Sequence, residues 1–496
     1  MDYSLLYFDA RRRPANQGLP QQRVLYDALR HAILDGRIVG GSRLQASRQL
    51  AAELGIARNS VLYAYELLAA EGLVRATRHG TLVTRCALNV EARPPRDQAR
   101  WAALLSARAR TLARGDLASR MLPFSAALPA LDAFPFDAWR ACLKRAWQAV
   151  DADDLGYADV RGHRALRDAI SRYLRLTRGV RCCRDQVIVT DGSQNGLDLC
   201  ARLLADPGDP VWVEDPGYHG ARAAFAAAGL AIRPLPVDAD GLAVPPDLWR
   251  TAPPKLIYVT PSHQYPLGAV MSLERRVALL DRALDCGAMI IEDDYDSEFR
   301  HGGEPLPALQ GIYEDAPVVY LGTFSKTLFP ALRLGFMVVP RGLADAAAQA
   351  LRNVQRRGHV TDQLALADFL ESGQFTAHVR RMRKLYGERQ AAVRAQIERQ
   401  LGGLVTVSHG AGGMHLSLRL DAPVEDTAVA ARAHDAGMEV RPISTLLLDR
   451  VRADRYNGLL IGYANIAADD AARQVGRLAG VVRAALADAA DTGRAA

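Results

Sequence analysis

From about residue 123 onwards, short apolar runs with strand character alternate with longer stretches of helical periodicity. The clearest strand candidates are Gln186–Thr190, Val211–Val213, Leu256–Val259, Ala288–Ile291 and Val318–Leu321. Runs that are apolar at nearly every position are typical of parallel strands buried on both faces. The alternation therefore predicts an α/β fold with a mostly parallel sheet covered by helices.

Polar clusters follow several of these runs, at the sheet edge where ligands of open α/β sheets bind. Thr190–Gly196 is a glycine-rich turn leading into a helix, whose first N–H groups favour phosphate, although a capped helix without ligand is the alternative. Tyr218 could stack on a flat ring, but a single such tyrosine is more often part of a core. Residues 291–296 place carboxylates at a strand end. No His or Cys accompanies them at ligand spacing, so no metal site is predicted.

Lys326 lies in the run Gly322–Gly335, seven positions before Arg333. Schiff-base chemistry needs an amine held near an aldehyde, and a guanidinium can grip a phosphate through two hydrogen bonds. This pair suits pyridoxal phosphate, whose pyridine nitrogen a carboxylate of the acidic run could keep protonated. The order of glycine-rich turn, aromatic, acid, lysine and arginine is more specific than any one cluster.

The first 86 residues carry most of the positive charge. They hold twelve Arg, no Lys and seven acidic residues, a net charge of +5 against +7 for the 496 residues. A basic module suggests a polyanion as partner. On charge alone, a basic surface that serves only solubility is the alternative.

The pattern of the basic segment predicts a winged helix-turn-helix. The expected elements are helices over Leu19–Asp35, Arg48–Leu54 and about Arg58–Glu71, and extended pieces over Leu73–Ala76 and Thr81–Thr84. Ser47 is predicted to cap the second helix. In this motif the third helix enters the major groove with its N-terminal end. A small helical interaction domain is the alternative.

The third helix begins with residues suited to reading DNA. Arg58 can read guanine, Asn59 can read adenine, and Ser60 can bind phosphate or base. The hairpin tip offers Arg78 and His79 to the DNA backbone or the minor groove.

The stretches Ser47–Val61 and Leu67–Leu73 resemble the GntR family of bacterial repressors, over about residues 19–85. The resemblance implies a double-stranded operator DNA as partner. By position, it implies DNA contacts from Arg48, Arg58, Asn59, Ser60, His79 and Gly80.

The order of clusters in the large domain resembles the fold-type I aminotransferases, over about residues 123–490. Thr260–Gly268 and Glu292–Phe299 are similar to the MocR subfamily of GntR regulators, which joins both parts in one chain. The resemblance implies a sheet with helices on both faces and a smaller C-terminal α+β subdomain. It divides the chain into a winged helix-turn-helix domain (1–86), a linker (87–122) and an aminotransferase-like domain (123–496).

By position, the resemblance also implies roles at a pyridoxal 5'-phosphate site. Lys326 would form the internal aldimine and Asp293 would face the pyridine nitrogen. Tyr295 would bond the ring hydroxyl, and Tyr218 would stack on the ring. The phosphate would be held by Ser193, Gln194, Thr323 and Arg333.

Two features depart from the aminotransferase pattern. Tyr265 stands where the family usually has an Asn that bonds the ring oxygen, and His263 is the nearest polar candidate. Leu459–Asn465 holds no arginine where many aminotransferases have one for the substrate carboxylate, and Arg441 and Arg455 are candidate substitutes. We therefore take His263 and Arg441 as candidate effector-binding residues.

The linker lacks the pattern of either neighbour. Pro94-Pro95 breaks regular structure, and four apolar residues, Trp101, Leu104, Leu105 and Leu112, could line one side of a short helix. We predict a linker with a docking element, and a disordered tether is the alternative.

Together these observations predict a bacterial transcription regulator. It would bind operator DNA and sense pyridoxal phosphate, or an amine or amino acid reacting with it, at Lys326. The alternative is an active aminotransferase with an auxiliary DNA-binding domain, and a residual half-reaction stays open. The resemblance implies a head-to-tail homodimer. No apolar run reaches the length of a membrane span and no CxxC spacing occurs, so a reduced cytoplasmic protein, on the nucleoid when DNA-bound, is predicted.

Overall fold

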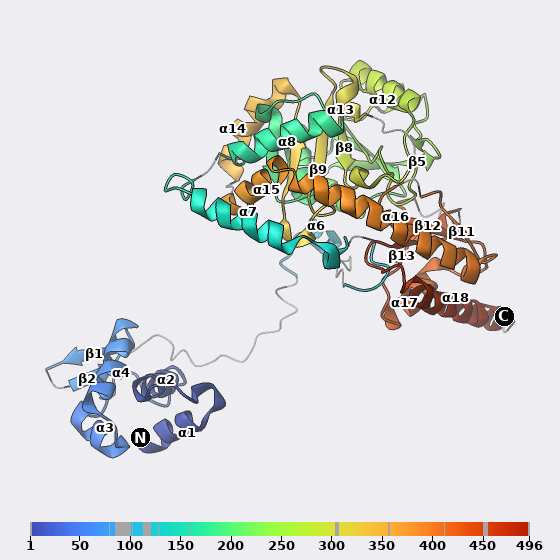
Figure 1. Ribbon diagram of the computed structural model, residues 1–496. Coiled ribbons are helices and arrows are strands. Elements are labelled where there is room, and N and C mark those ends of the chain that lie inside the picture. Colours follow the sequence, from blue (N-terminus) through green and yellow to red (C-terminus); the bar gives the residue numbers. More distant parts are fainter. Residues whose placement is uncertain are drawn as a thin grey trace. The chain divides into compact units, whose positions relative to one another are not determined.

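The computed structural model describes residues 2–78, 80–84, 101, 103–112, 121–126, 128–157, 159–302, 307–355, 358–410, 412–449 and 455–494. The chain divides into two compact units, Met1–Leu105 and Ser106–Ala496. Each unit has a hydrophobic core of its own and is described by itself (Figure 1).

The first unit is a small helical domain with a two-stranded hairpin. Its elements are α1 (Tyr3–Arg12), α2 (Gln21–Leu34), α3 (Ser47–Leu54), α4 (Arg58–Ala70), β1 (Val74–Thr77) and β2 (Gly80–Val83). Helices α2 and α4 share the core through Leu29 and Leu68, which have no exposed surface. The antiparallel hairpin places Val74 opposite Val83. The predicted winged helix-turn-helix is confirmed.

Two features of this unit differ from the sequence prediction. Ser47 does not cap the second helix, because α3 begins at Ser47 itself and Ala46 occupies the capping position. The hydroxyl of Ser47 accepts a hydrogen bond from Nε of Arg58, 3.4 Å away. Helix α1 was not predicted, since only Tyr7 and Ala10 of its ten residues are buried and the apolar period is weak.

An eight-stranded sheet forms the centre of the second unit, in the order β3-β10-β9-β8-β7-β4-β5-β6. The strands are β3 (Val187–Thr190), β4 (Pro210–Asp215), β5 (Ala231–Asp238), β6 (Gly241–Leu242), β7 (Leu256–Val259), β8 (Met289–Asp294), β9 (Val318–Thr323) and β10 (Gly335–Val338). Strands β9, β8, β7, β4 and β5 are mutually parallel. Strand β10 is antiparallel to β3 and β9, and β6 is antiparallel to β5. The mostly parallel sheet is confirmed.

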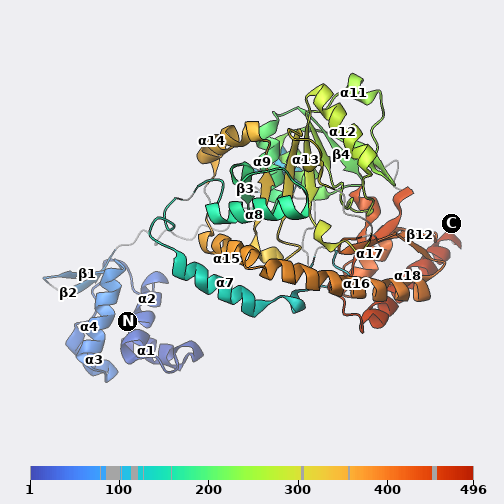
Figure 2. The same ribbon diagram turned by 45° about the horizontal axis from the view of Figure 1, so that its top comes forward.

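Helices cover both faces of this sheet. They are α7 (Phe136–Ala149), α8 (Arg164–Thr177), α9 (Ser193–Leu204), α10 (His219–Ala228), α11 (Leu248–Thr251), α12 (Leu273–Cys286), α13 (Leu309–Ile312), α14 (Ala344–Val354) and α15 (Val360–Glu371). Figure 2 shows α7, α8 and α15 side by side. Val187 and Val189 of β3 pack with these three helices, while Ile188 between them packs with α9, α10 and α14. This alternation along one strand shows that both faces are buried.

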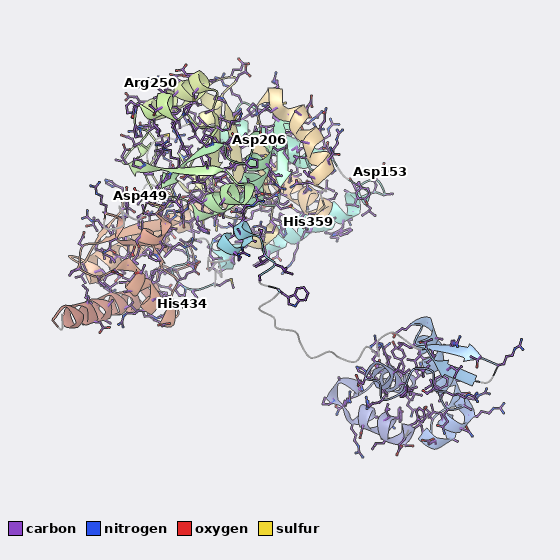
Figure 3. The ribbon with its side chains drawn as sticks, turned by 180° about the vertical axis from the view of Figure 1, so that it is seen from behind. Asp153, Asp206, Arg250, His359, His434 and Asp449 are labelled. Carbon is purple, nitrogen blue, oxygen red and sulfur yellow. The ribbon has the colours of Figure 1, made fainter. Side chains whose placement is uncertain are left out.

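The long helix α16 (Gln374–Leu401) leads to a smaller antiparallel sheet in the order β11-β12-β14-β13. Its strands are β11 (Val405–Val407), β12 (His415–Leu420), β13 (Arg441–Pro442) and β14 (Gly458–Gly462), accompanied by α17 (Asp426–Asp435) and α18 (Ala471–Arg494). Figure 3 shows His434 of α17 and Arg250 of α11 at opposite ends of the second unit. The C-terminal α+β subdomain is confirmed.

Most of the predicted linker, 87–122, lies outside the described residues. Its described part includes α6 (Ala107–Leu112), where Nη1 of Arg108 donates a hydrogen bond to the carbonyl of Ala227 at 3.1 Å. Trp101 and Leu104 precede α6 and are 64% and 70% exposed, so they do not line a buried helix face. Among the described residues, no helix is both long and apolar enough to cross a membrane.

Candidate functional site

A cavity of about 270 Å³ lies at the carboxyl ends of the parallel strands of the large sheet. The residues predicted to bind the cofactor all line it: Ser193, Gln194, Tyr218, Asp293, Tyr295, Thr323, Lys326 and Arg333. They lie up to 140 positions apart in the chain, and the fold brings them together.

Lys326 follows β9, and its half-buried side chain faces this cavity. Burial lowers the pKa of the Lys326 amine to about 8, and the nearby charge of Asp296 opposes that shift. An amine with this pKa is partly neutral near pH 7. It is therefore available as a nucleophile, as covalent capture of an aldehyde requires.

Asp293 is the last residue but one of β8, and only one of its carboxylate oxygens has a hydrogen-bond partner among the described residues. The hydroxyl of Tyr258 donates a hydrogen bond to Oδ2 of Asp293 at 2.8 Å, whereas Oδ1 is buried and has no hydrogen-bond partner among the described residues. Burial raises the pKa of Asp293 to about 7, and the Tyr258 bond acts against this. Leaving such an atom unpaired costs about 1–3 kcal/mol. A pyridine N–H is the kind of donor that would complete it, so this residue fits pyridoxal phosphate.

Gly192 and Arg333 lie against each other and form a cradle at the start of α9. A Cβ at Gly192 would lie 3.3 Å from Nη1 of Arg333, a tight contact, and the φ of +84° at this position favours glycine. Nη2 of Arg333 donates to the carbonyl of Asp191 at 2.6 Å. Arg333 itself has φ +51°, a left-handed conformation that non-glycine residues seldom adopt outside functional sites. The guanidinium and the first N–H groups of α9 can share one phosphate.

The two predicted ring-binding tyrosines are held by polar contacts. The hydroxyl of Tyr218 donates to Oε1 of Gln194 at 3.4 Å, and its ring meets the ring of Tyr265 edge-on at 5.7 Å. The hydroxyl of Tyr295 donates to the carbonyl of His263 at 2.9 Å. Both rings therefore have fixed positions in the cavity wall.

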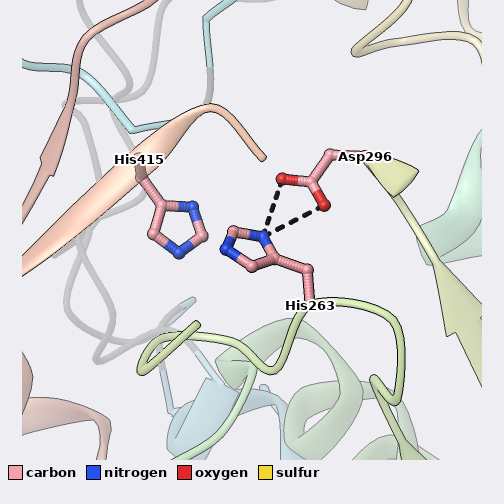
Figure 4. Close-up of side chains that lie close together, drawn as sticks. All are labelled: His263, Asp296 and His415. Carbon is pink, nitrogen blue, oxygen red and sulfur yellow. Dashed lines mark hydrogen bonds and ion pairs between the residues drawn. The ribbon is translucent and has the colours of Figure 1, made fainter. Parts of the chain in front are cut away.

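His263 lies behind Tyr295 and is not among the lining residues of the cavity. Its Nδ1 is 3.0 Å from Oδ2 of Asp296, and its ring lies 4.6 Å from the ring of His415 (Figure 4). The three side chains are near enough to suggest a metal site. The planes of the two rings are inclined by 32°. A Cβ at Gly413 would lie 2.1 Å from Cε1 of His263, which shows how tightly this cluster is packed.

Arg441 supplies the guanidinium that the sequence of β14 lacks. It lines the cavity, and its Nη1 donates to the hydroxyl of Tyr265 at 3.1 Å. Arg455, the other candidate, is exposed and does not line the cavity. Arg441 can thus meet a carboxylate that enters beside Lys326.

Sequence reasoning missed several residues of this cavity. Tyr258, Tyr265, His219 and His415 also line it. Tyr258 lies within an apolar strand, and the pattern of such a strand does not show which of its residues lie beside a ligand. A histidine at the start of a buried strand, as His415 is in β12, was a usable signal.

In the first unit, the side chains predicted to contact DNA lie mostly on the surface. Those of Arg48, Arg58, Asn59 and Arg78 are exposed, Ser60 is half-buried, and Gly80 begins β2. Val61 and Leu68 lie on the other side of α4 and are buried in the core. His79 lies outside the described residues. The first turn of α4 therefore presents polar groups outward, as a recognition helix does.

Comparison with known families agrees with this two-part architecture. Residues 122–453 match the family "Aminotransferase class I and II", and residues 21–83 match "Bacterial regulatory proteins, gntR family". The fold and the cavity thus define an aminotransferase-type domain joined to a gntR-type DNA-binding domain.

Relatives with both parts are known. The chain is 40% identical to the "Probable rhizopine catabolism regulatory protein MocR" of Rhizobium meliloti, over 90% of this chain and 91% of that protein. It is 35% identical to the "HTH-type transcriptional regulator TauR" of Rhodobacter capsulatus, over 95% of this chain and 98% of that protein. The chain belongs to the MocR-type transcription regulators of the gntR family.

Among solved structures, the second unit resembles LysN, the α-aminoadipate aminotransferase of Thermus thermophilus. That enzyme was solved with N-(5'-phosphopyridoxyl)-L-leucine, and the match has a TM-score of 0.67 and 26% identity, over 79% of this chain and 98% of that chain. The aminotransferase family and the residues of the cavity together indicate pyridoxal phosphate as the cofactor.

Proposed function

We propose that this protein binds operator DNA through α4 and the hairpin, and senses pyridoxal phosphate, or an amine or amino acid reacting with it, at Lys326. The observation that carries the proposal is one cavity holding both the Lys326 amine, with its lowered pKa, and the unpartnered Oδ1 of Asp293. When bound, pyridoxal phosphate supplies an aldehyde and an electron-withdrawing ring. The gntR-type domain on the same chain supports a regulatory use, in the bacterial cytoplasm where the chromosome lies.

Each cavity residue has a proposed role that its contacts support. The Lys326 amine would hold the cofactor through its aldehyde carbon, and Oδ1 of Asp293 would accept from the pyridine nitrogen while Tyr258 holds Oδ2. Tyr218 would stack on the ring, and the hydroxyl of Tyr295, which here donates to the carbonyl of His263, would instead bond the ring oxygen. The phosphate is proposed to be held by Ser193, Gln194, Thr323 and Arg333, which line the cavity near the start of α9.

We propose Arg441 as the residue that binds the carboxylate of an amino-acid effector. The guanidinium of Arg441 donates a hydrogen bond to the hydroxyl of Tyr265, which holds it towards the cavity. The carbonyl of His263 accepts a hydrogen bond from Tyr295 and so positions that tyrosine. An effector amine that replaced the Lys326 amine at the aldehyde carbon would leave Lys326 as a free amine. A ligand changes DNA affinity only through different affinity for two protein states, and this exchange offers such a difference.

Arg441 also favours a second candidate function, an active aminotransferase with an auxiliary DNA-binding domain. The guanidinium lies on β13, which pairs with β14 at Leu460, so it reaches the cavity from a neighbouring strand. Sustained keto-acid production from an amino donor would favour the enzyme. A single half-reaction without turnover would favour the regulator.

Two organisational features stay proposals. The first is the division into a DNA-binding domain (1–86), a linker (87–122) and an effector domain (123–496). The second is a head-to-tail homodimer, supported by large apolar side chains on α7 and after it, namely Phe136, Trp147, Leu155 and Tyr157, which are 54%, 63%, 72% and 93% exposed. Sedimentation of Trp147→Glu as a monomer would support this surface as the interface, and an unchanged dimer would count against it.

Lysine replacement tests the cofactor site. Lys326→Ala should abolish the absorbance band of the lysine-bound cofactor and its fixation by borohydride. Lys255→Ala, which removes an exposed lysine outside the cavity, should leave both unchanged. The same band in Lys326→Ala as in the parent chain would refute the site.

A further inference from the structure

The second unit contains another hollow, larger than the cofactor cavity. Its volume is about 550 Å³, and its walls come from α8, the segment after β7, the short helix Ser297–Phe299 and the first half of α16. We call it the back cavity and define it by Tyr173, Glu298, Arg300, Phe375, Arg380 and Arg383. Lys326 does not line it.

Three arginines line the back cavity without a carboxylate partner among the residues that the structure describes. Nε of Arg300 donates to the carbonyl of Gly302 at 2.8 Å, and Nε of Arg383 donates to the carbonyl of Glu298 at 3.0 Å. Arg380 lines the hollow from α16, and no hydrogen bond or ion pair of its side chain occurs within the described ranges. The terminal amino groups of all three guanidiniums are left for a ligand, and they suit a carboxylate or phosphate gripped bidentately.

The arrangement of these arginines favours a bound anion over a merely solvated surface. Arg380 and Arg383 lie three residues apart on α16, where like charges face each other and repel. An anion between them would remove that repulsion. Phe375 and Val379 of the same helix are 1% and 7% exposed and give the hollow an apolar wall. The site thus combines a cationic rim with room for a short carbon skeleton.

We propose that the back cavity binds a small organic anion, a carboxylic acid or a phosphate ester, through Arg300, Arg380 and Arg383. A volume of about 550 Å³ lies within the range of small-molecule sites. This ligand would be separate from pyridoxal phosphate and from the amine that reacts at Lys326, so the binding site does not depend on the proposed function.

Asp296 connects the back cavity with the cofactor cavity. It lines the back cavity, and its carboxylate lies against His263, whose carbonyl accepts from Tyr295 in the cofactor cavity. The negative charge of an anion beside Arg300 therefore repels the carboxylate of Asp296. A shift of Asp296 would move His263, and with it the hydrogen bond that Tyr295 donates to His263. This coupling, unlike the binding itself, rests on the proposed function.

Calorimetry on the cofactor-loaded full chain tests the site, with inorganic phosphate and succinate as separate probes. Loading fills the cradle at Gly192, so phosphate is left to the back cavity. We expect saturable binding, and the probe that binds distinguishes a phosphate ester from a carboxylic acid. Arg380→Gln/Arg383→Gln should lower the affinity by about tenfold or more, because two charge-assisted contacts are lost. Arg399→Gln, an exposed arginine further along α16, should change nothing.

Several results would overturn the proposal. These are the absence of saturable binding of both probes, an unchanged affinity in the double glutamine variant, or an equal loss in Arg399→Gln. Arg380→Lys/Arg383→Lys keeps the charge without the bidentate geometry, so its affinity should fall between those of the parent and the glutamine variant.

A spectral readout tests the coupling separately. Saturating probe should change the absorbance of the bound cofactor in the parent chain and not in the double glutamine variant. An unchanged spectrum together with calorimetric binding would overturn the coupling alone. If no cofactor binds, the proposed function fails, and the same comparison of variants in the cofactor-free chain still decides on the back cavity.

Discussion

Among the residues that line the cofactor cavity, Asp293 has a buried carboxylate oxygen, Oδ1, without a hydrogen-bond partner within the described residues. Asp293→Asn keeps the shape and the contact with Tyr258 but removes the charge that holds a proton on the pyridine nitrogen. We expect the affinity for pyridoxal phosphate to fall by about 10- to 100-fold, since hydrogen bonds to charged groups contribute about 1.5–3 kcal/mol. Absorbance titration measures this, with Asp285→Asn on the exposed side of α12 as the matched control. Equal affinity in both variants would contradict the assigned role.

The pKa of Lys326 makes a prediction about pH. Burial lowers it to about 8 from the ordinary 10.5, and only the neutral amine attacks an aldehyde. The rate of cofactor capture should therefore rise with pH up to about 8 and then level off, whereas an ordinary lysine would keep gaining about tenfold per pH unit to about pH 10. Stopped-flow absorbance at a series of pH values gives the profile. A rate still climbing above pH 9 would contradict the burial of this amine.

At the residue scale, the sequence located the parts of the site that lie just after strands. Lys326 and Asp293 could be predicted because each follows an apolar run, and residues in that position gather at one edge of a parallel sheet. Arg333, which lies before β10, was predicted from its spacing of seven positions from Lys326. Tyr258 could not, because it lies within the run. The sequence left Arg441 and Arg455 as candidates for binding a substrate carboxylate. The pairing of β13 with β14 brings Arg441 to the cavity, and this pairing could not be predicted from the sequence.

Helix α4 is the element through which we propose that the first unit recognises DNA. Its buried side holds Leu68 in the core, and its first turn exposes Arg58 and Asn59. Arg58→Ala should weaken binding to DNA from the promoter region beside its gene by about 1–3 kcal/mol if Arg58 reads a base. Fluorescence anisotropy would show this, with Arg23→Ala, an exposed arginine paired with Asp27 on α2, as the control. The same affinity in the two variants would remove Arg58 from the interface.

The local sequence pattern predicts some helices and strands well and misses others. The core strands were predicted within a few residues, because complete burial leaves an unbroken apolar run, as in β7 over Leu256–Val259. Helix α1 was missed, since its burial depends on contacts with α2 and α3 that no local period reveals. The antiparallel β10 was also missed, because strand direction follows from the connection after Arg333 and not from composition.

On the scale of the whole molecule, the two units have separate hydrophobic cores. A substitution that destabilises one unit should therefore leave the stability of the other unchanged. Leu68→Ala removes a fully buried side chain from the first unit and should cost it about 2–5 kcal/mol of unfolding free energy. DNA binding should then be lost at a lower temperature, while the cofactor's absorbance melts as in the parent chain. Leu5→Ala, at a position 61% exposed, serves as control. Loss of both signals at one temperature would mean that the units unfold together.

The central claim is that chemistry at Lys326 changes the affinity of the first unit for DNA. The most direct measurement is the DNA affinity of the cofactor-loaded chain, by anisotropy, with and without each member of a panel of amines and amino acids. We predict a change of about fivefold or more for at least one of them in the parent chain, and none in Lys326→Ala. An equal change in Lys326→Ala, or steady keto-acid production with unchanged DNA affinity, would contradict the account.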